Sequence, residues 1–186
     1  MGQAKRRKLA GDYPEQTKGR IETGKCSGCT LCCVLLPIEE MSKPAYVPCH
    51  NICAIGCSIH ESTALPAVCA GFKCMHIEQN MPPDLLPPHP LKCGAYVYGF
   101  MQNGKYIVVV AVDPRRPFDW KKEAKIRAIM EATLNRGIAL AVVDRGYQIA
   151  VRSPADIAHV LSADAVAEMR AKGEKPGFAG GDAFGT

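Results

Sequence analysis

The sequence predicts an α+β protein in which an irregular cysteine-rich region precedes a ββαββα layer. All ten cysteines lie between Cys26 and Cys93, in a stretch with little helical or strand periodicity, whereas residues 94–172 contain none and show clear periodicity. The 186 residues, 47% of them hydrophobic, suffice for one ordinary domain or two small ones. We expect a basic flexible arm (1–23), a cysteine-cluster region (24–93), the ββαββα layer (94–172) and a disordered tail (173–186).

Two β-hairpins are predicted within the layer. The apolar runs 96–101 and 106–112 flank Asn103-Gly104, and an Asn-Gly pair between such runs is the strongest short hairpin signal. Residues 138–143 and 147–151 flank a second turn that also contains glycine. Together the hairpins predict a four-stranded sheet, antiparallel or mixed.

A helix is predicted after each hairpin. Asp119 is placed to cap the first helix, and Gly137 stands where a helix ends in a left-handed residue. The apolar face of this helix comprises Ile126, Ile129, Met130 and Leu134. Ser153, Pro154 and Asp156 form a cap, a first-turn proline and a capping box for the second helix. We expect both helices on one face of the sheet.

The cysteines are predicted to be reduced or metal-bound. The N-terminus is basic but lacks the apolar segment of a secretory signal, which predicts a cytoplasmic protein. In a reducing compartment, clustered cysteines indicate metal or redox chemistry more than disulfides. The longest apolar run, residues 106–112, is far shorter than the roughly 18 residues of a membrane span, so no membrane association is expected.

A metal could organise the cysteine-rich region. The run 34–38 and a few scattered aliphatic residues are expected to bury too little apolar surface to offset the ordering of the whole region. A structural zinc site contributes an apparent free energy of about 10–16 kcal/mol in small peptides, and this energy stabilises the fold.

The spacing of the cysteines supports thiolate ligation. Cys26, Cys29 and Cys32 follow one another at the C-x2-C interval that directs two thiolates to one ion. The doublet Cys32-Cys33 is less common, because neighbouring side chains point in different directions; it indicates two adjacent sites or a separate role for one member. Cys53 and Cys57 have the i, i+4 spacing of a helix. Eight cysteines would complete two four-thiolate centres.

The cysteine pattern resembles a known family. After C-x2-C-x2-C-C come Pro48-Cys49, then 57–61 (Cys-Ser-Ile-His-Glu), then 66–74 (Pro-Ala-Val-Cys-Ala-Gly-Phe-Lys-Cys). Over residues 24–76 this order is similar to the zinc- or iron-chelating cysteine-cluster family, also called the CxxCxxCC or YkgJ-type domain. The chain departs from it at His60, where the family has Tyr, at Leu65, where it has Arg, and in a Cys57–Cys69 interval two residues longer.

The resemblance implies a set of metal ligands. They are Cys26, Cys29, Cys32, Cys33, Cys49, Cys57, Cys69 and Cys74. Cys53 and Cys93 fall outside the family pattern, Cys93 being expected to pack, and His60 is either a substitute ligand or an exposed histidine. The family includes bacterial lysine methylases acting on flagellin and proteins described as iron-sulfur oxidoreductases, so the resemblance implies a metal centre without a particular reaction.

The cofactor is expected to be zinc or iron, with an iron-sulfur cluster as one form of the latter. The C-x2-C-x2-C triplet occurs in bacterial ferredoxins, but the C-x3-C-P that follows there is absent. Soft thiolates would also accept Cu(I), a third alternative. No Ser-His-Asp set, paired carboxylates or nucleotide fingerprint identifies catalytic residues.

Three functions follow from these observations. The first is a metal-binding protein whose centre is structural or serves metal handling, with metal ions as the partners. The second is an iron-sulfur enzyme or enzyme subunit related to the methylases or oxidoreductases. The third is a zinc-dependent nucleic-acid binder that uses the basic run 5–8; a solvated arm explains that run better, so nucleic acid is not favoured.

Overall fold

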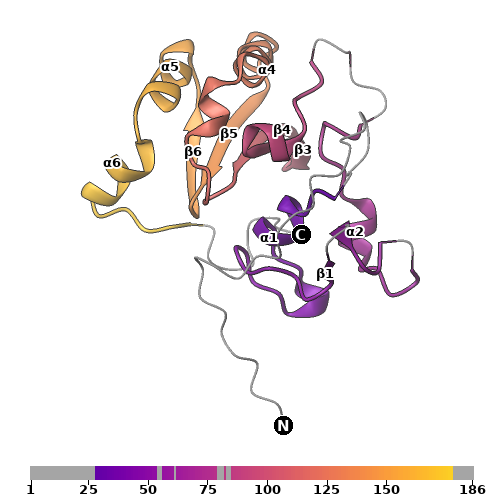
Figure 1. The fold of residues 1–186 in the computed structure, drawn as a ribbon. Coiled ribbons are helices and arrows are strands. Elements are labelled where there is room, and N and C mark those ends of the chain that lie inside the picture. The colour runs from indigo at the N-terminus through magenta and orange to yellow at the C-terminus, as the bar shows by residue number, and fades with distance from the viewer. Residues whose placement is uncertain (1–27, 54–55, 61, 79–81, 83–84, 178–186) are drawn as a thin grey trace.

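The computed structural model of the protein describes residues 28–53, 56–60, 62–78, 82 and 85–177. The expected basic arm (1–23), the proposed ligand Cys26 and most of the expected tail (178–186) lie outside the described residues. The described part is a mixed helix and strand structure built on one four-stranded sheet (Figure 1).

The sheet contains both predicted hairpins. Its strands are β3 (Ala95–Gln102), β4 (Lys105–Val112), β5 (Ala139–Asp144) and β6 (Tyr147–Val151), in that spatial order. Asn103 and Gly104 have φ of 50° and 73°, as a two-residue hairpin turn of the favoured twist requires. β3–β4 and β5–β6 pair antiparallel, and β4–β5 pair parallel because a helix connects them. The sheet is therefore the mixed alternative.

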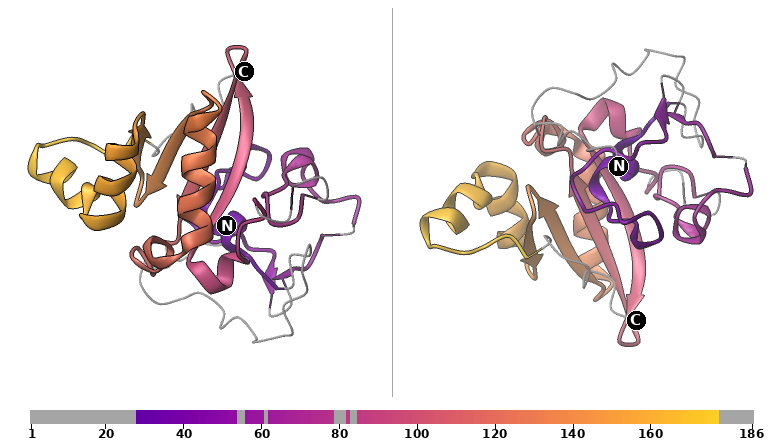
Figure 2. Two further views of the ribbon diagram at one scale, coloured as in Figure 1. Left: turned by 90° about the horizontal axis from the view of Figure 1, so that it is seen from above. Right: turned by 90° about the horizontal axis from the view of Figure 1, so that it is seen from below.

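One face of the sheet is covered by the helices that follow each hairpin (Figure 2). They are α4 (Ala124–Asn135) and α5 (Pro154–Ser162), with the short η2 (Asp119–Lys122) before α4. The capping box of Ser153 and Asp156 is formed, and Gly137 has a φ of 69° after α4, both as predicted. The prediction for Asp119 was wrong: Asp119 begins η2 and its carboxylate pairs with Arg116 at 2.7 Å, while Glu123 occupies the N-cap position of α4.

A third helix in this layer, α6 (Ala165–Ala171), was not predicted. Its N-cap is Asp164, whose carboxylate accepts a hydrogen bond from the Ala167 N–H at 3.1 Å. The same carboxylate pairs with Arg145 in the β5–β6 turn at 2.5 Å. The hydrogen bond from Arg145 lowers the pKa of Asp164. Asp164 therefore both caps α6 and connects it to the β5–β6 turn, and the contact of Arg170 with the Tyr147 ring of β6 is a second link to the sheet.

The double role of Asp164 can be tested by two substitutions. Asp164→Ala should lower the free energy of unfolding by about 1–2 kcal/mol, because it removes the cap and a partly exposed ion pair. Asp164→Asn should cost about 0.5 kcal/mol, since asparagine caps as well as aspartate and only the ion pair is lost. Urea unfolding at neutral pH measures both values, and equal losses in the two variants would contradict the capping role.

The lowered pKa of Asp164 also predicts a pH dependence. A carboxyl whose pKa is lower in the folded than in the unfolded state stabilises the fold fully above its unfolded pKa of about 4. This contribution disappears as the pH falls through the folded pKa. The stability difference between wild type and Asp164→Asn should therefore shrink in acid.

The cysteine-rich region covers the opposite face of the sheet (Figures 1 and 2). Its elements are all short: α1 (Leu31–Leu35), η1 (Glu39–Met41), β1 (Ile52–Cys53), β2 (Gly56–Cys57), α2 (Ala67–Gly71) and α3 (Pro90–Cys93). Helices and strands of two to five residues are not stable alone in water, so contacts with the sheet or with a ligand must hold them.

Part of this region buries more apolar surface than the sequence led us to expect. Leu31, Val34 and Leu35 of α1 are buried against the sheet, where they pack with Tyr96 and Tyr98 of β3. The expectation that the run 34–38 contributes too little burial to organise the chain is therefore wrong for α1. The elements η1, β1 and α2 contain no fully buried residue, so we still expect another source of stability for them.

Cys53 and Cys57 do not lie on a helix. They belong to the two strands of an antiparallel hairpin, with Ile52 opposite Cys57 and Cys53 opposite Gly56. The helical interpretation of their spacing is wrong, because the chain reverses between them.

No helix in the described ranges is both long and apolar enough to cross a membrane.

Candidate metal centre

The helix α1 places two of the predicted ligands beside each other. Its apolar residues at positions 31, 34 and 35 face the sheet, which leaves Cys32 and Cys33 half-buried. A hydrogen bond from the Cys32 thiol lowers the pKa of the Cys33 thiol to about 7; burial opposes this shift and the charge of Lys43 adds to it. A large fraction of Cys33 is therefore thiolate near neutral pH, the form that binds metals.

Two loops bring further thiols to Cys33. The Cys49 N–H donates to the Cys33 carbonyl at 3.1 Å, so the chain after η1 returns to α1. The Glu40 carboxylate accepts from the Ala67 N–H at 3.1 Å and the Val68 N–H at 3.3 Å, which holds the start of α2. α2 carries Cys69.

Five members of the predicted ligand set form what we call the thiol cluster: Cys32, Cys33, Cys49, Cys57 and Cys69. Burial raises the pKa of Cys57 and of Cys69, and in both the negative charges of Cys33 and Cys49 raise it further. Thiols that influence one another in this way lie in one electrostatic neighbourhood. Deprotonating all of them without a cation nearby would be costly, and a bound metal ion would remove that cost.

Lys43 is the cation that the fold itself places beside the thiol cluster. Its side chain is buried and its ammonium donates to the carbonyls of Val34 at 3.3 Å, Pro44 at 3.1 Å and Leu36. Burial lowers the pKa of Lys43 to about 8, although the thiolates of Cys49 and Cys33 act in the opposite direction. The Val34 and Leu36 carbonyls lie at the end of α1, so Lys43 connects the helix terminus to the cluster.

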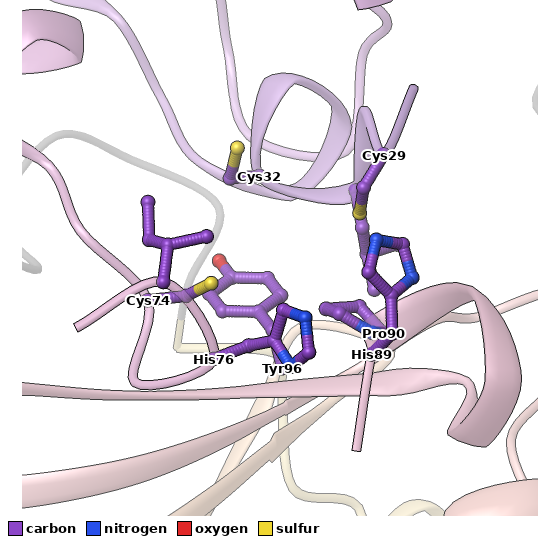
Figure 3. A pocket seen from close by; sticks show the side chains of 9 residues that line it. Cys29, Cys32, Cys74, His76, His89, Pro90 and Tyr96 are labelled. Atoms are coloured by element: carbon purple, nitrogen blue, oxygen red, sulfur yellow. The ribbon is translucent and has the colours of Figure 1, made fainter. Parts of the chain in front are cut away.

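The other two described ligands of the predicted set lie in a different place. Cys29 and Cys74 line a small cavity between α1 and the sheet, together with His76, His89 and Tyr96 (Figure 3). Cys32 also borders this cavity, but its thiol points away from it in Figure 3. The predicted ligands therefore form two neighbourhoods instead of one, with Cys26 outside the described residues.

The remaining candidates have other surroundings. Cys93 is fully buried in the core between the sheet and the helices α4 and α5. Its thiol donates to the Ala95 carbonyl at 3.1 Å, as expected of a packing residue. His60 is exposed. Cys53 is half-buried in the β1–β2 hairpin, and its charge contributes to the raised pKa of Cys57. None of the nine cysteines that the structure describes forms a disulfide.

The side chains are not converged on an ion. Across residues 28–177, gaps excepted, no group of three or more His, Cys, Asp or Glu side chains is arranged so that it could hold a metal. The donor types nevertheless suit zinc or iron, since thiolates and imidazole are the usual protein ligands of both. Binding would require the thiols to reorient, which in cysteine needs rotation about only one bond.

The ligand set predicted from the sequence includes neither His76 nor Tyr96. Both are buried, and each has one polar atom without a hydrogen-bond partner among the described residues, Nε2 of His76 and the hydroxyl of Tyr96, which is unusual. The Cys74-Met75-His76 sequence was a usable signal for His76, because it places two donor types two residues apart. Nothing in the sequence around Tyr96 distinguishes it from an ordinary strand residue.

Comparison with family models, curated proteins and solved structures gave no match to this chain. The similarity to the cysteine-cluster family therefore stays a prediction that rests on the cysteine pattern.

Proposed function

We propose that this protein binds zinc or iron through the thiolates of its cysteine-rich region, and that the metal is structural or is handled as cargo. The observation that supports the proposal best is the thiol cluster itself. Segments that are distant in sequence bring five thiols into one neighbourhood, with Cys33 partly ionised near neutral pH. Other small apolar residues would pack equally well at these positions, so packing alone does not require a cluster of reduced thiols.

The position of the cluster favours a structural contribution. It lies among the shortest elements that the structure describes, where β1 and β2 have two residues each and α2 has five. A metal bound by Cys33, Cys49 and Cys69 would connect α1, the following loop and α2. Such a connection would supply the stability that the limited apolar burial of these loops does not.

Metal analysis tests this function. We expect protein purified anaerobically without added metal to retain zinc or iron after gel filtration, at about two ions per chain if eight thiolates form two four-ligand centres. Elemental analysis counts the ions, and the visible spectrum separates them, since thiolate-bound iron is coloured and zinc is not. Iron with inorganic sulfide would favour a redox centre. Metal-free protein whose cysteine-rich region resists proteolysis would contradict the proposal.

A further inference from the structure

His76 is a buried histidine with one ring nitrogen left without a partner. The side chain is 6% exposed, and Nδ1 lies 3.0 Å from the Pro87 carbonyl oxygen. A carbonyl oxygen can only accept, so Nδ1 carries the proton and the neutral ring has its lone pair on Nε2. No described side-chain or backbone group bonds to Nε2. A basic nitrogen is thus held in a fixed tautomer, buried and unsatisfied.

Tyr96 presents a second unsatisfied group to the same cavity. Its side chain is 2% exposed, and its hydroxyl has no hydrogen-bond partner among the described residues. Burial raises the pKa of Tyr96 well above 10, and the charges of Cys32 and Cys74 act in the same direction, so the hydroxyl keeps its proton and remains a donor. In Figure 3 the Cys74 thiol points toward this hydroxyl.

The neighbouring His89 differs from His76 in its tautomer. The two rings are 4.9 Å apart and nearly perpendicular. His89 Nδ1 accepts a hydrogen bond from the Leu91 N–H at 3.2 Å and caps α3, so in the neutral ring the proton is on Nε2. Of these two histidines, only His76 offers the cavity a lone pair without giving up an existing hydrogen bond.

We propose that Cys29, Cys74 and His76 Nε2 bind one metal ion in this cavity, as a mixed sulfur and nitrogen site distinct from the thiol cluster. The three donors are not converged in the structure, so binding requires the two thiols to rotate about their Cα–Cβ bonds toward Nε2. This inference rests on the proposed metal-binding function and specifies one of its sites. The Pro87 carbonyl fixes the tautomer of the histidine ligand, and the Tyr96 hydroxyl donates to a thiolate. Each cysteine releases its proton to solvent when it binds the ion.

Charge favours a mixed ligand set at this position. The walls of the cavity include Leu31, Ile77 and Pro90, which do not solvate charge. A divalent ion with two thiolates and a neutral imidazole has no net charge, whereas four thiolates around the same ion would leave a charge of about −2 in apolar surroundings. The Cys32 thiol points away from the cavity and donates a hydrogen bond to Cys33, so we assign it to the thiol cluster.

Two asparagine variants of the full chain test the assignment, with zinc alone as the probe under reducing conditions. In His76→Asn the amide can still donate to the Pro87 carbonyl, but Nε2 is lost. In His89→Asn the side-chain oxygen can still cap α3, because asparagine is among the best N-cap residues. Zinc content and X-ray absorption at the zinc edge are measured for wild type and both variants, with circular dichroism to establish folding.

The expected result is specific to His76. Wild-type zinc should show sulfur at about 2.3 Å and nitrogen at about 2.0–2.1 Å. His76→Asn should lose the nitrogen contribution and bind zinc at this site at least 10-fold more weakly, whereas His89→Asn should match wild type. Cys74→Ser should reproduce the loss of the site.

The outcomes separate this inference from the function on which it depends. If wild type binds zinc through sulfur alone, or if His76→Asn keeps the nitrogen contribution, the mixed site is wrong while the metal-binding function stands. If wild type binds no zinc or iron, the function itself fails. If His76→Asn does not fold, the wild-type spectrum alone decides, since it reports whether imidazole is a ligand.

Discussion

Cys33→Ser is expected to remove metal from the thiol cluster and to unfold the loops between η1 and α2. Cys33 has the lowered pKa of about 7 and lies beside Cys32 and Cys49, so it is partly ionised at neutral pH and ready to bind a metal. A structural zinc site contributes about 10–16 kcal/mol in small peptides, and loss of one of four ligands should remove much of this. Metal content and hydrogen exchange of residues 39–74 measure the effect.

Cys93→Ser is the matched control for this prediction. Cys93 is buried under the sheet and donates to the Ala95 carbonyl, a hydrogen bond that a serine hydroxyl can also make. This variant should keep the wild-type metal content. Unchanged metal in Cys33→Ser, or equal loss in both variants, would remove Cys33 from the ligand set.

Trp120→Ala is expected to destabilise the ββαββα layer by about 3–5 kcal/mol, the usual cost of removing a large buried aromatic side chain. Trp120 is 1% exposed and belongs to the core between the sheet and the helices α4 and α5. Its Nε1–H donates to the Pro117 carbonyl at 3.0 Å, so the substitution also removes a hydrogen bond. Urea unfolding followed by far-ultraviolet circular dichroism measures the change, since the variant lacks the only tryptophan.

Phe118 provides the comparison for Trp120. It is 48% exposed and its ring contacts are cation–π contacts with Lys121 and Arg145. Phe118→Ala should therefore cost less than about 1 kcal/mol. A similar loss in the two variants would show that burial of Trp120 does not stabilise the layer as described.

The ββαββα layer could be predicted because its signals are local. The Asn103-Gly104 turn and the capping box of Ser153 and Asp156 each act within four residues, and both are present in the structure. The prediction of helix starts was wrong or incomplete at two aspartates. Asp119 begins a 3-10 turn before α4, and Asp164 caps an additional helix while it also pairs with Arg145 across the fold.

The residue types of the candidate site could be predicted from the sequence, but the division of these residues between two places in the fold could not. The cysteine spacing indicated thiolate ligands, and seven of the eight lie within the described residues. The division between the thiol cluster and the cavity was not predictable, because α1 directs Cys32 and Cys33 to one side while Cys29 precedes the helix. His76 is a candidate ligand because the Pro87 carbonyl fixes its tautomer, and this contact is not apparent from the sequence.

The sequence by itself determined the hairpins, the capped helix α5 and the presence of a cysteine-rich segment, since short-range backbone preferences and composition are sufficient for these. Tertiary structure decided the parallel pairing of β4 with β5 and the packing of α1 on the sheet. It also placed His76 and Tyr96 in one cavity beside Cys29 and Cys74. These contacts join residues far apart in the chain, so local backbone preferences do not decide them.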